Sequence, residues 1–515
     1  MTRPKLLPAA AGVAIAFAVA TCVSGPSTTH PSANPTTDSS NTSAPPTRGA
    51  ALYQRHCSVC HGADGDAKTP VASLLLPRPT PFREGLFKLV STTNGMPTDD
   101  DLVRTLRRGM PGSTMMAWGW MPDDDLRALA QEVRTIALRG RTESIHRTAA
   151  IAGRGISLAD AASIAARHLA PGEPVDAGER AADTPGNAAE GERLYRQHCA
   201  SCHGNDGRGL PSTQEWPTDG TWLWPRDFTQ GYLRGEPSHR ELAFRIRAGM
   251  PGAHMPPARL STAETEALVA HVKSLIPEAA GDHHVQWRRT IRVTRSARLP
   301  AADDDAGWQR VDAARLPLAP LWWRPDAADE LWLRVVHDGS DIAVRLEWAD
   351  PVRDDTARPD TKMGDGAAIQ FARSNDPPLF AMGSPDAPVN VWRWHAFDPK
   401  ETAGMIDLAA QPHGGLDVPV GSAAPRPRSE SLQLHGVDSA PSATGSGLAL
   451  DVKTNWRDGR WTVTFRRSLA ARAPHEVDLA APGPVLMAFA IWDGRIDAHP
   501  GSKAITTWHV LDLQR

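Results

Sequence analysis

Two short motifs in the N-terminal half of the chain carry residues that could attach one kind of cofactor. The sequence Cys-x-x-Cys-His occurs within LYQRHCSVCHGADG and again within LYRQHCASCHGNDG. Its members are Cys57, Cys60 and His61 in the first copy, and Cys199, Cys202 and His203 in the second. Two thiols at this spacing can each form a thioether with the same porphyrin, and the histidine that follows can bind its iron. The repeat therefore predicts two covalently bound haem c groups.

Three other chemistries use paired cysteines. Two Cys-x-x-Cys pairs could share a zinc ion, but that site would leave both histidines unused. A thioredoxin-like redox pair requires a βαβ context, which is missing around both motifs. Simple disulfides remain an alternative for the thiols of an exported protein.

A second pair of segments carries methionines. RRGMPGSTMMAW and RAGMPGAHMPPA align without a gap and pair Met115 with Met255. A thioether is a soft ligand for the sixth position of haem iron, and a Met/His pair raises the reduction potential. Met110 and Met116 compete with Met115, as Met250 competes with Met255. The alignment favours Met115 and Met255, and we expect Met110 and Met250 to pack against the haem.

Together these motifs resemble the mono-haem class I cytochrome c family, in which the attachment motif comes early and a Gly/Pro-rich loop delivers the distal methionine. The resemblance implies axial pairs of His61 with Met115 and of His203 with Met255. With the sixth position filled, the iron would have no open site for a substrate.

Helices at both ends of each repeat must position these motifs. One helix leads through a Leu-Tyr pair into the cysteines, and a second closes each repeat. The closing helices show buried stripes at Leu126, Leu129, Val133 and Ile136, and at Leu268, Val272 and Leu275, the latter after a capping box from Ser261 to Glu264. We predict two small all-α cytochrome c domains, at 48–140 and 187–280. The linker between them, 141–186, contains an Ala-rich stretch at 157–169 that could form a short helix.

The N-terminus predicts export. MTRPKLLPAAAGVAIAFAVATC has a basic start, a short apolar run and an Ala-x-Ala end, which is the pattern of a signal peptide over residues 1–21. Cys22 lies in a sequence similar to a lipoprotein cleavage box, and it is a candidate lipid anchor; the alternative is ordinary cleavage near Ala20. Residues 22–47 read as a flexible linker. The predicted location is the periplasm, either free or as a membrane-anchored lipoprotein.

The chain of 515 residues has a formal net charge of −3, which favours neither nucleic acid nor an anionic membrane as a partner. Beyond residue 285 the sequence alternates like strands, with turns at Asp338-Gly339 and Asp458-Gly459. Most of the 17 tryptophans lie in this part. These features predict a β-sandwich-like domain at 285–515, which taken alone could be a carbohydrate-binding module.

Three stretches of this domain carry a resemblance: DGAAIQFA, FAMGSPDAPVNVWRWHA and AFAIWDGRIDAHPGSKAITTWHVLDL. They are similar to the haem-b-binding γ subunits of the ethylbenzene dehydrogenase and dimethyl sulfide dehydrogenase group. The resemblance implies one non-covalent haem b held between Met382 and Lys503. It also implies a molybdenum enzyme with an iron–sulfur subunit as partner. The histidines of this domain, such as His337 and His509, are expected to be packing or surface residues.

The leading hypothesis is an exported electron-transfer protein with two haem c and one haem b and no catalytic site of its own. It would connect molybdopterin and iron–sulfur oxidoreductase subunits with a soluble cytochrome or a terminal oxidase. The first alternative is a haem enzyme, a peroxidase or dehydrogenase, which would require five-coordinate iron. The second is a di-haem cytochrome c with a haem-free β binding module.

Overall fold

The computed structural model describes most of the chain between residues 45 and 513. The described residues are 45–178, 185–209, 225–278, 281–324, 326–355, 364–374, 377–378, 383–396, 428–435, 448–474, 476–495 and 503–513. The predicted signal peptide, Cys22 and Met382 lie outside them. Within these ranges, no helix combines the length and the apolar character needed to cross a bilayer.

The first repeat is helical. Its elements are α1 (Arg48–His56), α2 (Ser58–His61), α3 (Pro70–Ser73), η1 (Phe82–Glu84), α4 (Asp99–Arg108) and α5 (Asp123–Ile151). Three aspartates occupy the first turn of α5, where the helix dipole favours negative charge. The predicted stripe of α5 is buried. Helix α1 crosses α5 at Gly49, where a Cβ atom would lie 2.3 Å from the carbonyl oxygen of Ala128. Only glycine allows this close approach.

The second repeat has the same construction. Its elements are α7 (Pro185–His198), α8 (Ala200–His203), η2 (Phe228–Gln230), α9 (His239–Arg247), η3 (Pro251–Ala253) and α10 (Thr262–Leu275). Gly191 meets the carbonyl oxygen of Ala267 as Gly49 meets that of Ala128. The predicted capping box between Ser261 and Glu264 is confirmed.

The segment between the repeats is more ordered than a simple linker. Helix α5 continues to Ile151, beyond Gly140, and α6 (Leu158–Leu169) forms where the Ala-rich stretch predicted a short helix. Leu169 and Val175 pack against the core of the first repeat. The connecting segment therefore adds to that core.

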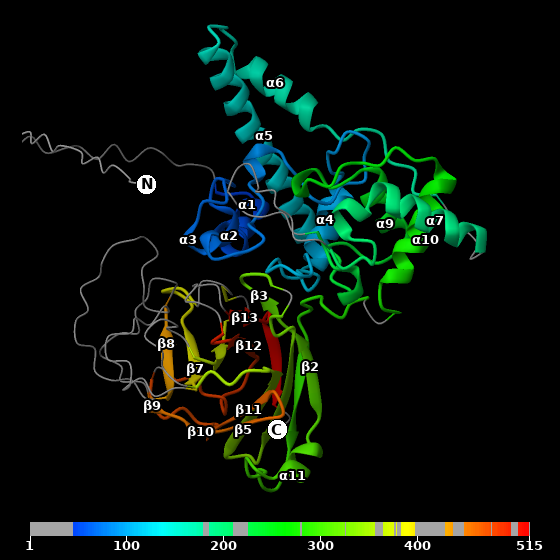
Figure 1. Cartoon of the computed structure of the whole chain (residues 1–515). Coiled ribbons are helices and arrows are strands. Elements are labelled where there is room, and N and C mark those ends of the chain that lie inside the picture. Colours follow the sequence, from blue (N-terminus) through cyan, green and yellow to red (C-terminus); the bar gives the residue numbers. More distant parts are fainter. Residues whose placement is uncertain are drawn as a thin grey trace, which may run out of the picture. The chain divides into compact units, whose positions relative to one another are not determined.

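The C-terminal domain consists of strands in two layers, drawn from green to red in Figure 1. The strands are β1 (Thr290–Arg295), β2 (Ala313–Pro317), β3 (Ala319–Pro320), β4 (Glu330–His337), β5 (Asp341–Ala349), β6 (Gly366–Ala372), β7 (Val389–His395), β8 (Ser429–Leu434), β9 (Leu448–Ala449), β10 (Asp451–Arg457), β11 (Arg460–Ser468), β12 (Val485–Trp492), β13 (Lys503–Ile505) and β14 (His509–Leu513). A short helix, α11 (Asp305–Gln309), follows β1. The strand order is β10-β11-β5-β4-β1-β14-β12-β6-β7-β8-β9.

Strand β1 connects the two layers. It pairs with β14 through residues 290–293 and with β4 through Thr294 and Arg295. One apolar cluster takes side chains from strands of both layers, among them Leu346, Trp392 and Phe489. Both predicted hairpins form, β4–β5 and β10–β11. Asp458 and Gly459 have φ values of 52° and 69°, as the tight turn requires. The fold is sandwich-like, as the alternating sequence predicted.

Candidate functional site

The first Cys-x-x-Cys-His motif opens on a mainly apolar cavity of about 110 Å³. Cys57, Cys60, His61 and Met115 all line it. The apolar part of the wall includes Leu75, Phe82, Leu102, Leu106 and Val133. The structure thus brings together all four residues that the sequence predicted to hold the first haem.

Two contacts orient the imidazole of His61. Its Nδ1 lies 2.9 Å from the carbonyl oxygen of Thr80, and the ring stacks on Phe82 with centroids 4.3 Å apart. A carbonyl only accepts, so Nδ1 carries the proton and Nε2 keeps its lone pair for a metal. Burial lowers the pKa of His61 to about 4, which keeps the ring neutral. A neutral imidazole with its proton on Nδ1 is the form that an iron ligand requires.

The cysteines are placed for covalent chemistry rather than for a zinc site. Burial raises the pKa of Cys57 and of Cys60 to about 12, so both are protonated thiols before any reaction. Cys57 packs against the core of the first repeat, whereas Cys199 packs against that of the second. None of the four motif cysteines forms a disulfide. Among the described residues, these cysteines and histidines form no group of three or more that could hold a metal ion.

The methionine loops of the two repeats close in the same way. The N–H of Met110 donates to the carbonyl of Met115 at 2.8 Å, and the N–H of Met250 donates to that of Met255 at 2.8 Å. This backbone equivalence supports the gapless alignment and the pairing of Met115 with Met255. Met116 is buried in a cluster that includes Leu321 and Ile505 of the C-terminal domain, so its side chain already has a packing role.

The second motif repeats the arrangement of the first. The Nδ1 of His203 lies 3.2 Å from the carbonyl oxygen of Arg226, and its ring stacks on Phe228 at 4.6 Å. Burial lowers the pKa of His203. The hydroxyl of Tyr195 donates to the carbonyl of Gly204 at 2.9 Å, as the corresponding tyrosine does in the first repeat. Residues 210–224, next to this motif, lie outside the described part of the chain.

Lys503 begins β13 and is half-buried. Its Nζ lies 5.6 Å from the centroid of the Trp492 ring, and the residue lines a small cavity with Trp322, Asp350 and Asp493. Met382 is outside the described residues, so the Met382–Lys503 pair stays a prediction. His337 and His509 are buried in the domain, 3% and 1% exposed. This fits the packing role expected for them.

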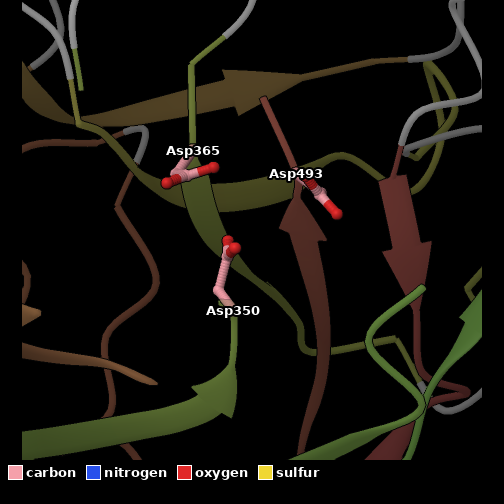
Figure 2. A group of neighbouring side chains, drawn as sticks. All are labelled: Asp350, Asp365 and Asp493. Carbon is pink, nitrogen blue, oxygen red and sulfur yellow. The ribbon is translucent and has the colours of Figure 1, made fainter. Parts of the chain in front are cut away.

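Three aspartates meet at strand ends, and the sequence reasoning did not identify them. Asp350 follows β5, Asp365 precedes β6 and Asp493 follows β12 (Figure 2). They offer oxygen atoms within 4.8 Å of one another, which would suit a cation. However, Arg324 and Arg495 already pair with Asp493.

The other two aspartates differ in their partners. Asp365 accepts hydrogen bonds from the Trp461 indole and from the backbone N–H groups of Asp354 and Gly494, at 2.8–2.9 Å. In the described structure Oδ2 of Asp350 is buried without a hydrogen-bond partner. Burial and the charges of Asp365 and Asp493 raise the pKa of Asp350 to about 8. The group is therefore an ionic network with one neutral carboxyl, and its only sequence signal is an aspartate next to the end of a strand.

We expect Asp350→Asn to stabilise the protein at alkaline pH. Below the ordinary pKa of a carboxyl, near 3.9, a raised folded-state pKa does not lower the free energy of unfolding. That free energy then falls as the pH rises from this value toward the folded-state pKa. The amide mimics the neutral acid, so the gain should be on the order of 2 kcal/mol at pH 8 and small at pH 4. Thermal unfolding at both pH values measures it, with the exposed Asp451→Asn as control. Equal effects at the two pH values would contradict the assignment.

Three family models match successive segments of the chain. Residues 305–504 match the family model described as ethylbenzene dehydrogenase. Residues 188–275 match cytochrome c, and 44–131 match cytochrome c oxidase, cbb3-type, subunit III. The predicted resemblance is confirmed: cytochrome c domains precede a domain of the ethylbenzene dehydrogenase type. The cytochrome c domains imply haem c as a cofactor.

Two curated relatives are γ subunits. The dimethylsulfide dehydrogenase subunit gamma of Rhodovulum sulfidophilum is 29% identical over 41% of this chain and 73% of its own length. The chlorate reductase subunit gamma of Ideonella dechloratans is 27% identical over 43% of this chain and 83% of its own length. A solved chain of the Kuenenia stuttgartiensis reducing HAO-like protein complex is 28% identical, with a TM-score of 0.37, and the match covers 45% of this chain and 97% of that one.

Proposed function

We propose that this chain is an exported electron-transfer protein with two haem c and one haem b. Its cytochrome c domains precede a domain similar to γ subunits of oxidoreductases. When bound, haem iron supplies one-electron oxidation and reduction. The chain would supply the attachment thiols, the axial ligands and the apolar walls.

The observation that carries this proposal is the cavity of the first repeat. Its apolar lining and its two protonated thiols fit a porphyrin, and His61 presents the correct nitrogen. Met115 lines the same cavity, as Met110 and Met116 do, and its alignment with Met255 favours it as the residue that would complete the coordination. Two axial ligands from the chain favour electron transfer over substrate chemistry at the iron. This argues against the peroxidase alternative.

Contacts between the domains support an order for the centres. The backbone N–H of Leu321 donates to the carbonyl of Lys503 at 2.9 Å, and the N–H of Leu76 donates to the carbonyl of Leu321 at 2.8 Å. Leu75 and Pro77, on either side of Leu76, line the first cavity. Two hydrogen bonds thus connect the strand of the proposed haem b ligand with the wall of the first haem c site. We infer the order haem b, first haem c, second haem c.

The proposed partners follow from the γ-subunit relatives. A molybdopterin and iron–sulfur oxidoreductase would exchange electrons with the haem b domain, and a soluble cytochrome or a terminal oxidase with the other end of the chain. The N-terminal pattern supports periplasmic location, with Cys22 as a candidate lipid anchor.

Haem analysis tests the proposal. Protein purified from a periplasm that matures cytochromes c should give a pyridine haemochrome ratio of two haem c to one haem b. Carbon monoxide should not bind rapidly to the reduced protein, because each iron has two ligands from the chain. Absence of haem b would favour the haem-free binding module, and rapid carbon monoxide binding would favour an enzyme.

We expect Met115→His to keep the first haem attached and to lower its reduction potential, because imidazole favours ferric iron more than a thioether does. The shift should be on the order of 0.1 V, within the range of roughly 0.8 V that axial ligands span. Potentiometric titration should show one wave moved down and the others unchanged. Met110→His is the control, and a shift in that variant alone would make Met110 the ligand.

A further inference from the structure

The second cytochrome domain contributes to the cavity of the first. Arg234, which follows η2, lines the same cavity as Cys57, His61 and Met115. Phe244 and Ala248, in and after α9, belong to the apolar core cluster of the first repeat. The first haem site is therefore completed by residues about 30 or more positions beyond the second attachment motif.

Arg226 lies at the same junction. Its carbonyl orients His203, and its guanidinium donates to the carbonyl of Gly112, in the loop that carries Met115, at 2.9 Å. The guanidinium also lies over the ring of Trp323, 5.4 Å from the centroid. One residue thus contacts the ligand segments of both cytochrome domains and the C-terminal domain.

The two arginines lack a matching negative charge. Among the described residues no carboxylate pairs with Arg226, and Arg234 forms no hydrogen bond or ion pair. Nε of Arg226 is buried without a partner. Burial lowers the pKa of Arg226 to about 9 and of Arg234 to about 10, and the charge of Arg234 adds to the effect on Arg226. Two neighbouring half-buried cations disfavour each other, so a bound anion would stabilise this site.

We propose that Arg234, assisted by Arg226, binds a propionate carboxylate of the haem in the first cytochrome domain, so that the second domain completes the cofactor site of the first. The inference rests on the proposed haem loading of the first cavity. A planar guanidinium is suited to a carboxylate, and an ion pair at the edge of a dry cavity is strong. The positive charge also stabilises the reduced haem relative to the oxidised one. The second domain would therefore raise the potential of the first haem.

The test compares Arg234→Gln, Arg234→Lys and the wild type as full-length proteins. Haem content is measured by pyridine haemochrome, and potentials by spectroscopic titration, with the wave of the first haem identified through Met115→His. We expect Arg234→Gln to keep both haem c groups and to shift the first wave down, while Arg234→Lys stays near the wild type. Arg193→Gln, which removes an exposed arginine from the same domain, should shift neither wave.

Each result decides the inference. Loss of the first haem in Arg234→Gln but not in Arg234→Lys also supports it, because only the charge distinguishes those variants strongly. An unshifted first wave in loaded Arg234→Gln overturns it, as do equal effects of glutamine and lysine, which indicate packing alone. Absence of the first haem from the wild type would instead contradict the proposed function.

Discussion

The double variant Cys57→Ser/Cys60→Ser is expected to lose one covalent haem and, with it, part of the stability of the first cytochrome domain. Serine cannot form the thioether, so the porphyrin has no covalent attachment there. The cavity of about 110 Å³ would then be empty. At about 24 cal/mol per Å³, an empty cavity of this size would cost about 3 kcal/mol, a substantial part of the roughly 5–15 kcal/mol that stabilises a domain. Helices α1, α4 and α5 should therefore pack less stably.

The second domain should keep its haem in this variant. Leu194, Leu268 and Val272 form a separate apolar core around α7 and α10. Mass spectrometry and haem-stained gels should show one covalent haem per chain, and thermal unfolding followed by circular dichroism should show a lower free energy of unfolding than in the wild type. The mirror variant, Cys199→Ser/Cys202→Ser, should retain the first haem. Loss of both haems from either variant would contradict the separation into two sites.

Local sequence was sufficient to predict the attachment chemistry. The spacing of Cys57, Cys60 and His61 places them on one short helix and its N-cap, and no distant residue is needed to recognise them. The pairing of Met115 with Met255 was also accessible, because the second repeat provides an internal alignment. The strands were predicted where a tight turn such as Asp458-Gly459 joins alternating residues.

Contacts between distant segments were not accessible. Arg234 resembles any loop arginine in the sequence, and its place in the first cavity depends on how the repeats pack. The aspartate network needs the ends of β5, β6 and β12 to meet, which strand patterns do not specify. Gly140 resembles a helix end, but it lies within α5, where a Cβ atom would be 2.4 Å from the Cβ of Arg83. A glycine required for close approach looks the same as one required for a turn.

The second large effect is expected for Lys503→Ala, which should remove haem b or leave its iron five-coordinate while both haem c signals persist. An amine binds iron only when deprotonated, and a free lysine has a pKa near 10.4. A neighbouring iron would oppose the proton on the amine. Lys503 is half-buried at the start of β13, beside Trp492. Its backbone carbonyl is fixed by Leu321, so the strand should persist after truncation of the side chain.

Spectra and haem analysis of Lys503→Ala distinguish ligation from ordinary packing. Loss of the ligand should reduce haem b to well below one per chain, or allow carbon monoxide to bind rapidly to the reduced iron. Lys453→Ala, on an exposed position of β10, is the matched control and should leave haem b unchanged. An intact six-coordinate haem b in Lys503→Ala would disprove ligation by this residue. The remaining role of Lys503 would then be electrostatic, because Asp493 lines the same small cavity and an ammonium there would offset its charge.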